Sequence, residues 1–346
     1  MNSTTKKRIL ARVYSMSTII IVALVFLVFT IATAAKGIRF LKPSNLSTIL
    51  NQASFLVVLG IGQALVILTG GIDLSVGALM AFVTVFWGEF LLKGSETHFM
   101  VSVVGVLLTG AAIGLLNGLL ITKLRIPPFI VTFATMYACR GLGWVYLRNR
   151  VLYPLDETFR VIATGKLFKI DKFLVKTPVL IAVVLLFAAW FVLRKTNVGR
   201  KIYFTGANPT AARFSGINTD RVKIGVYVAS SVLAAFAGLM YVARLNACEP
   251  GLGHDSNFDA ITVALIGGFA MSGGYGNIWG VLGGALVAYT IQSGMNSLQM
   301  PSELQDLISG CLIIFAVFIN QLLANRRMEL ENDIHDAKAE RTVTKS

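Results

Sequence analysis

The feature that most limits what this chain can fold into is a series of long apolar runs without charge. The first reads MSTIIIVALVFLVFTIATAA and covers residues 16–35. About 20 apolar residues in a helix cross the roughly 30 Å hydrocarbon core of a bilayer. Charged residues make up only 14% of the 346 residues, against about a quarter in soluble domains. We therefore expect a membrane protein that crosses the bilayer many times.

Glycine, proline and charged residues divide the chain into ten candidate spans. A helix satisfies every backbone polar group within its own segment, and the alternating pattern of membrane barrel strands is absent. We predict an all-α fold, a polytopic transmembrane helix bundle in a single domain over residues 17–323. Segments 1–16 and 324–346 flank it, and a polar segment covers 194–223. The predicted spans are 17–35, 49–69, 74–92, 101–122, 127–147, 178–193, 224–244, 259–272, 278–298 and 304–323.

The basic residues indicate topology rather than nucleic-acid binding. The net charge of +14 is scattered over many short segments, and Lys and Arg are enriched in cytoplasmic loops of membrane proteins. Basic residues precede the first span, and Arg326 and Arg327 follow the last, so an even number of spans places both termini in the cytoplasm. The loop 148–177 disagrees, because it is assigned outside and still carries seven Lys and Arg. An undetected span there would reverse part of the topology.

Glycine marks two breaks in the bundle. The stretches TGGIDLSVG (69–77) and GGFAMSGGYG (267–276) each interrupt an apolar region. We predict broken or re-entrant segments near 70–77 and 267–276, which is typical of transporters with a site near the membrane midplane. Downstream of each break, small residues recur at four-residue spacing, a pattern that favours close helix packing. They are Gly110, Gly114 and Gly118 in one half, and Gly280, Gly284 and Ala288 in the other.

No motif for enzyme chemistry is present. The nearest match to a Walker A loop, ATGKLF (163–168), lacks the upstream glycine and the Ser or Thr after Lys166. The three histidines are isolated, and neither a zinc-binding helix nor a serine nucleophile elbow occurs. We predict no catalytic residue, no metal site and no cofactor.

Two charged residues fall in the predicted membrane region, Asp73 at the break between two spans and Arg140 within a span. Charge in a membrane is costly and marks pairing or a pathway. Asp73 precedes a helical run, so it either caps that helix by accepting a backbone N–H from residue 75 or 76, or contacts a substrate or ion. Arg140 either extends to the outer interface or binds a buried acceptor. We predict that Asp73, Arg140, Ser75 and Asn117 line or brace the substrate pathway, with Asp73 and Arg140 acting alone or as a pair.

A polar island, NPTAARFSGINTD (208–220), separates two apolar runs. Asn208 is a good N-cap, Pro209 suits the first helical position, and Gly216 can end the helix in a left-handed conformation. We predict a short cytoplasmic helix. From these residues alone it is either an ordinary loop helix or an element that docks into a groove on a partner.

Three stretches in this order carry a family resemblance over nearly the whole chain, residues 17–323. They are TGGIDLSVGALMAF, GRKIYFTGANPTAARFSGINTDRVK (199–223) and LIGGFAMSGGYGNIWGVLGGAL (265–286). The chain resembles the permease subunits of bacterial ABC importers for simple sugars, of the ribose, galactose and xylose type. One segment departs from the family: PSELQDLISG (301–310) has Glu303 and Asp306 where relatives commonly show an aromatic residue and Gln.

The resemblance implies a ten-span permease in the bacterial inner membrane. It implies three protein partners: an ABC ATPase subunit, a periplasmic substrate-binding protein and a second permease subunit. It also implies that the segment around the polar island is the coupling helix that docks on the ATPase. The residues assigned to that coupling role are Gly206, Asn208, Pro209, Ala211, Ala212, Phe214 and Gly216.

Two other classes of function remain open at this point. An ion-coupled secondary transporter of a small polar solute needs carboxylates within the membrane, and Asp73 is the one available. A receptor or scaffold would need a folded soluble domain, and the longest polar segments of about 30 residues are shorter than an ordinary domain. The sequence does not distinguish which sugar a permease of this kind would carry.

Overall fold

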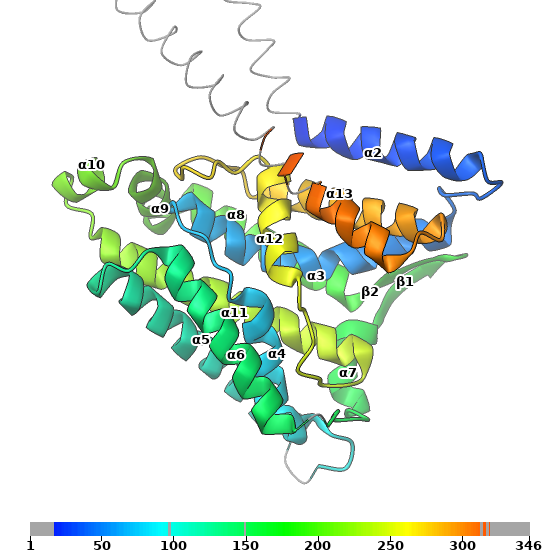
Figure 1. Ribbon diagram of the computed structural model, residues 1–346, viewed down its shortest axis with the longest axis horizontal. Coiled ribbons are helices and arrows are strands. Elements are labelled where there is room, and N and C mark those ends of the chain that lie inside the picture. The colour runs from blue at the N-terminus through cyan, green and yellow to red at the C-terminus, as the bar shows by residue number, and fades with distance from the viewer. Residues whose placement is uncertain (1–16, 96–97, 149, 312–313, 316–317, 319–346) are drawn as a thin grey trace, which may run out of the picture.

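The computed structural model describes residues 17–95, 98–148, 150–311, 314–315 and 318 (Figure 1). The predicted terminal segments 1–16 and 324–346, and most of the last predicted span beyond Cys311, lie outside the described residues. The fold is an all-α bundle, as predicted. Its helices are α2 (Ser17–Ala34), α3 (Pro43–Leu68), α4 (Val76–Phe86), the 3-10 helix η1 (Gly88–Leu91), α5 (Phe99–Lys123), α6 (Pro128–Leu147), α7 (Glu157–Thr164), α8 (Thr177–Lys195), α9 (Asn197–Ala207), α10 (Pro209–Phe214), α11 (Thr219–Leu245), α12 (Ser256–Ile266) and α13 (Trp279–Ser297).

Four of the described helices, α3, α5, α8 and α11, are long and apolar enough to cross a membrane, whereas α2, α4 and α12 are apolar but shorter. α3 and α11 are mostly buried and form the centre of the bundle. α5 and α8 turn most of their apolar surface outward, where Leu108, Phe187 and Phe191 are exposed. Such an apolar exterior is what a lipid-facing surface requires.

Both predicted breaks are present. α3 ends at Leu68 and α4 begins at Val76, while α12 ends at Ile266 and α13 begins at Trp279. Gly70 and Gly268 have positive φ values of 75° and 85°, a conformation in which a residue with a Cβ atom is strained. The chain after Gly70 turns back into the bundle, because Asp73 is fully buried.

The glycine patterns do place helices in close contact. α11 packs most extensively against α5, and a Cβ atom added at Gly114 would lie 2.6 Å from the carbonyl oxygen of Tyr227. Gly110 and Gly118 meet α11 in the same way. In the other half, Gly280 and Gly284 let α13 approach the backbone of α12 and of the break that follows it.

One feature differs from the all-helical expectation. β1 (Lys166–Ile170) and β2 (Phe173–Lys176) form an antiparallel hairpin with Asp171 in its turn at φ 50°. β2 is attached to the start of α3, where the Ser47 hydroxyl donates to the Leu174 carbonyl at 2.5 Å. The described part of 148–177 thus holds α7 and a hairpin, with no further span. Figure 1 shows the hairpin at one end of the bundle and α10 at the opposite end.

Candidate functional site

The polar island folds as predicted. The Asn208 side chain caps α10 by accepting from the Ala211 amide at 2.9 Å, and Pro209 occupies the first helical position. The helix ends after Phe214, where Gly216 adopts a φ of 79°. The Gly216 amide donates to the Arg213 carbonyl at 3.0 Å. The Asn208 cap at the start and the Gly216 turn at the end therefore give this six-residue helix a defined shape.

α10 presents one large apolar side chain to the outside. Phe214 is 89% exposed, the highest exposure among the large hydrophobic residues of the described chain. Ala211 is exposed as well, whereas Ala212 is buried and packs toward the bundle. An aromatic ring left uncovered on a rigid helix is typical of a protein-binding surface.

The segment before α10 contains a helix that the sequence did not predict. α9 follows α8 directly and is capped by Thr196, whose hydroxyl accepts from the Gly199 amide at 3.4 Å. α9 brings Gly206 against the two glycine breaks. A Cβ atom at Gly206 would collide with the carbonyl oxygen of Leu68 and lie 2.5 Å from the Gly274 amide nitrogen.

We call this contact the glycine junction, formed by Leu68, Gly206, Gly273 and Gly274. The Gly274 amide donates to the Leu68 carbonyl at 2.9 Å, which ties the two breaks to each other. Next to the junction, the Tyr203 hydroxyl donates to the Gly276 carbonyl at 2.8 Å. Burial raises the pKa of the Tyr203 hydroxyl, so it keeps the proton that it donates. α9 is thereby fixed to both breaks.

α10 is also tied to the helix that follows it. The Arg213 guanidinium donates to the Thr219 hydroxyl at 2.7 Å and to the Asp220 carboxylate at 2.9 Å, both in the first turn of α11. The ion pair is half exposed, and such pairs contribute at most about 1 kcal/mol. The ion pair matters more for geometry, because it holds α10 against the first turn of α11.

A second group of polar side chains lies inside the bundle. One Asp73 oxygen accepts from the Ser75 amide at 2.9 Å and from the Ser75 hydroxyl at 2.6 Å. The other oxygen accepts from the Ser230 hydroxyl of α11 at 3.1 Å. The predicted bond from residue 75 is therefore present, and Asp73 braces the turn that leads into α4.

The network continues to α5 and α6. The Asn117 amide donates to the Ser75 hydroxyl at 3.3 Å, and the Asn117 carbonyl oxygen accepts from Thr135 at 2.6 Å. Gln63 of α3 bonds to the backbone of Asp73. With its side-chain amide oriented accordingly, it donates to the Asp73 backbone carbonyl at 3.1 Å and accepts from the Asp73 backbone amide at 3.3 Å. Asp73, Ser75 and Asn117 are all fully buried. We call these residues, with Ser230, the Asp73 network.

Arg140 lies apart from this network. Its guanidinium donates to the His254 carbonyl at 2.6 Å, and no ion pair between Arg140 and Asp73 occurs in the described structure. The two side chains make separate contacts, because Asp73 bonds to Ser230 of α11 while Arg140 reaches the loop before α12. Of the four predicted pathway residues, three come together and the fourth does not.

The partners that complete these two sites were not predicted from the sequence. Ser230 and Ser231 form a polar pair within the apolar run of α11, which was an available signal. Leu68 takes part in the glycine junction through its backbone carbonyl, which leaves no trace in side-chain chemistry. No group of three or more possible metal ligands occurs among the described residues.

The comparisons with known proteins agree with this architecture. Residues 45–317 match a family described as a branched-chain amino acid transport system permease component. The chain is 37% identical over 302 residues to the ribose import permease protein RbsC of Escherichia coli strain K12, covering 87% of this chain and 92% of the relative. No solved structure gives a significant match.

Two further relatives carry the names of other sugars. The chain is 34% identical to the fructose import permease protein FrcC of Rhizobium meliloti, over 82% of this chain and 80% of the relative. It is also 34% identical to the D-allose transport system permease protein AlsC of Escherichia coli strain K12, over 82% of this chain and 86% of the relative. Since the family match and these relatives each cover most of the sequence, the chain belongs to this family of transport-system permease components.

Proposed function

We propose that this chain is the membrane permease subunit of an ATP-driven ABC importer that moves a small sugar into a bacterial cell. The similar proteins named above import ribose, fructose and allose, which favours a sugar over the amino acid in the family description. In this role the chain spans the inner membrane several times with both termini in the cytoplasm. A periplasmic binding protein delivers the sugar, a separate ATPase subunit hydrolyses ATP, and a second permease subunit completes the pathway.

The observation that carries this proposal is the exposed Phe214 on a capped helix between two spans. α10 is linked to α11 through Arg213 and to the glycine junction through α9. A groove on the ATPase that receives Phe214 would therefore move α11 and both breaks together. Gly206, Asn208, Pro209 and Gly216 serve this role by shaping the segment, and Ala211 adds to the docking face.

Removing the Phe214 ring tests the proposal. A buried aromatic anchor contributes about 2 kcal/mol or more to an interface, so Phe214→Ala should weaken ATPase association roughly thirtyfold or more. The matched control is Phe191→Ala on the outward face of α8, where the residue is 57% exposed. Association is measured with purified permease in detergent. If both variants bind the ATPase with equal affinity, α10 is not part of the ATPase interface.

The Asp73 network has a different role in this proposal. Asp73, Ser75 and Asn117 brace the re-entrant turn beside the pathway, so that movement at the glycine junction reaches α4 and α5. Arg140 braces the loop before α12 through the His254 carbonyl. The ion-coupled alternative has less support, since both Asp73 oxygens already accept hydrogen bonds from protein groups.

A further inference from the structure

Three cavities that share polar lining residues lie along α3, α11 and α13. The largest, about 460 Å³, lies between the start of α3 and the ends of α11 and α13. A second, about 300 Å³, extends toward β2 and shares Thr48, Gln52 and Arg244 with the first. These volumes fall within the range of about 300 to 1,000 Å³ for small-molecule sites. The two cavities therefore adjoin each other at these three side chains.

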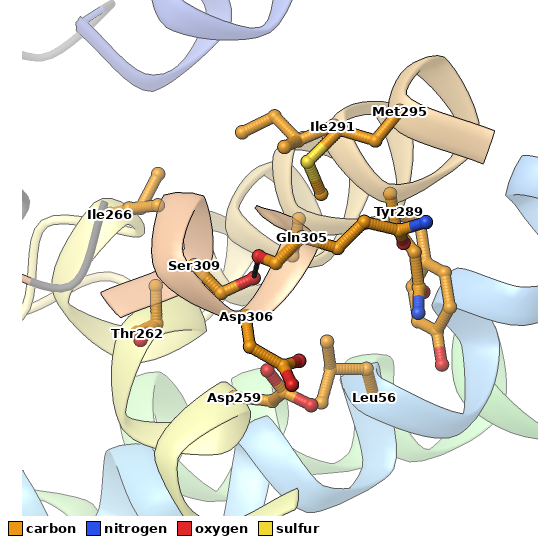
Figure 2. Close-up of a pocket in the computed structure, with 12 residues that line it drawn as sticks. Leu56, Asp259, Thr262, Ile266, Tyr289, Ile291, Met295, Gln305, Asp306 and Ser309 are labelled. Carbon is orange, nitrogen blue, oxygen red and sulfur yellow. Dashed lines mark hydrogen bonds between the residues drawn. The ribbon is translucent and has the colours of Figure 1, made fainter. Parts of the chain in front are cut away.

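The third cavity adjoins the first and lies between α3, α12, α13 and the segment 305–309 (Figure 2). It shares Tyr289 and Gln292 with the first and reaches Ile266 at the end of α12. Ile266 directly precedes the 267–276 break, which forms part of the glycine junction. The three cavities therefore run from the hairpin end of the bundle toward the segment that we propose to be driven by ATP. We call them together the polar path.

The side chains of the polar path suit a polyhydroxylated ligand. Amide and hydroxyl groups predominate in the largest cavity, where Gln52, Gln292 and Asn296 each offer donors and acceptors. Gln292 and Asn296 are exposed. Tyr241 and Tyr289 add aromatic rings with polar tips. A neutral sugar needs many hydrogen bonds in both directions together with apolar faces, and this lining provides both.

Arg244 supplies a fixed positive group where the first two cavities meet. Its guanidinium donates to the Gln52 side-chain oxygen and lies 5.4 Å from the Phe55 ring centre and 5.6 Å from that of Tyr241. No carboxylate of the described residues forms an ion pair with Arg244. A guanidinium held in this way can donate two parallel hydrogen bonds, which matches neighbouring hydroxyl groups on a sugar ring.

The end of the polar path next to α12 carries acceptors instead. Asp259 of α12 and Asp306 line the third cavity, and Figure 2 shows both carboxylates turned into the same part of it. Donors therefore predominate near Arg244 and acceptors near Asp259. In contrast, the Asp73 network is sealed from any cavity, since Asp73, Ser75 and Asn117 are 0% exposed.

We infer that the polar path is the surface along which a neutral monosaccharide is bound during transport, with Arg244, Gln52, Tyr289 and Gln292 as its hydrogen-bonding contacts. This inference rests on the proposed function. It adds specific substrate-contacting residues, none of which belongs to the polar island or to the Asp73 network.

The test uses the complete transporter in proteoliposomes, with its ATPase and binding protein and radiolabelled ribose, fructose and allose as probes. Tyr289→Phe and Gln292→Leu each remove hydrogen-bonding groups from the polar path. Each should lower uptake of the transported sugar about fivefold, as expected for one lost hydrogen bond, while ATPase association stays unchanged. Tyr137→Phe is the matched control, because Tyr137 is exposed on α6 beside Phe133 and away from the cavities.

A labelling experiment separates a direct contact from a change in folding. Gln292→Cys is placed in a Cys311→Ser background, because Cys139 and Cys248 are buried and Cys311 is exposed. Reaction with a small membrane-impermeant maleimide should slow severalfold when the transported sugar is present during ATP turnover. Lys169→Cys, at an exposed position on β1, should react in the same background at the same rate with and without sugar.

The outcomes distinguish this inference from the function on which it rests. If the unaltered complex takes up none of the three sugars, the proposed sugar import fails and this inference fails with it. If the unaltered complex transports sugar, but Tyr289→Phe and Gln292→Leu match the control and Gln292→Cys shows no protection, then the polar path alone is refuted.

Discussion

Asp73 shows what a single side chain does in this bundle. It is a buried carboxylate with two serine partners, and the described structure gives it no cationic neighbour within ion-pair distance. Hydrogen bonds to a charged or buried acceptor compensate for the loss of water around it. The residue therefore holds the 69–75 turn in place against α11, and it joins a break in the backbone to a continuous helix.

Asp73→Ala should lower the free energy of unfolding by about 2 kcal/mol or more, because three donors from Ser75 and Ser230 lose their acceptor inside the bundle. Thermal unfolding of the purified permease in detergent measures this. Asp255→Ala is the control, since Asp255 is exposed and its side chain caps no helix. A variant at Asp73 as stable as the control would mean that the network does not brace the turn.

At this scale the sequence predicted the local bonds and missed the distant ones. The Asn208 cap, the Gly216 turn and the bond from residue 75 to Asp73 depend on residues a few positions apart, which sequence spacing reveals. The Ser230 bond spans 157 positions, and the bond from Arg140 to His254 spans 114. Such contacts depend on how the helices pack, which no local pattern in a single chain specifies.

Helix contacts at the next scale depend on where a glycine allows backbones to approach. On α5, Gly110, Gly114 and Gly118 face α11, whereas Gly225 of α11 has no atom within 4 Å of an added Cβ. Glycines at helical positions thus have opposite roles. The three glycines of α5 allow it to pack closely against α11, whereas Gly225 makes no such contact and only weakens its own helix.

Gly114→Ala and Gly225→Ala should change stability in opposite directions. An added methyl at Gly114 overpacks against the Tyr227 carbonyl and should destabilise by about 1 to 3 kcal/mol. At Gly225 the same change removes backbone freedom without a clash and should be neutral or stabilise by up to about 1 kcal/mol. Paired thermal melts in detergent compare them. Equal shifts would contradict the close α5–α11 contact.

Gly206→Ala tests the glycine junction without altering α10. The added methyl would push α9 away from Leu68 and Gly274, an overpacking of about 1 to 3 kcal/mol that should reduce sugar uptake about tenfold or more. ATPase association should be retained, because Phe214 is unchanged. Uptake and association are measured on the same preparation. Normal uptake would show that movement of α10 reaches the spans by another route.

Element prediction from sequence succeeded where apolar length and glycine breaks were decisive. The main spans and both breaks were found, since these follow from the demands of lipid on the backbone. α9 was not predicted, because Asn197–Ala207 is short and mixes basic with apolar residues. The β1–β2 hairpin was missed as well, although its Phe, Ile, Leu and Val residues on either side of Asp171 and Lys172 fit a strand–turn–strand pattern.

In the whole molecule, the two functional regions proposed above lie at opposite ends of the bundle. α10 with Phe214 lies at one end, and the hairpin with the outer cavities lies at the other (Figure 1). α3 lines the polar path and ends at Leu68 of the glycine junction. α11 lines the path through Arg244 and is bonded to α10 through Arg213, and α13 begins directly after the 267–276 break. A push on α10 therefore acts on helices that also line the route proposed for the sugar.

The measurement that tests this account most directly is sugar uptake by proteoliposomes containing the permease with its ATPase and binding protein. The account predicts uptake that requires ATP and the ATPase subunit and that persists when a protonophore collapses the proton gradient. Uptake that continues without the ATPase and stops with the protonophore would contradict it, and would make the chain an ion-coupled transporter instead.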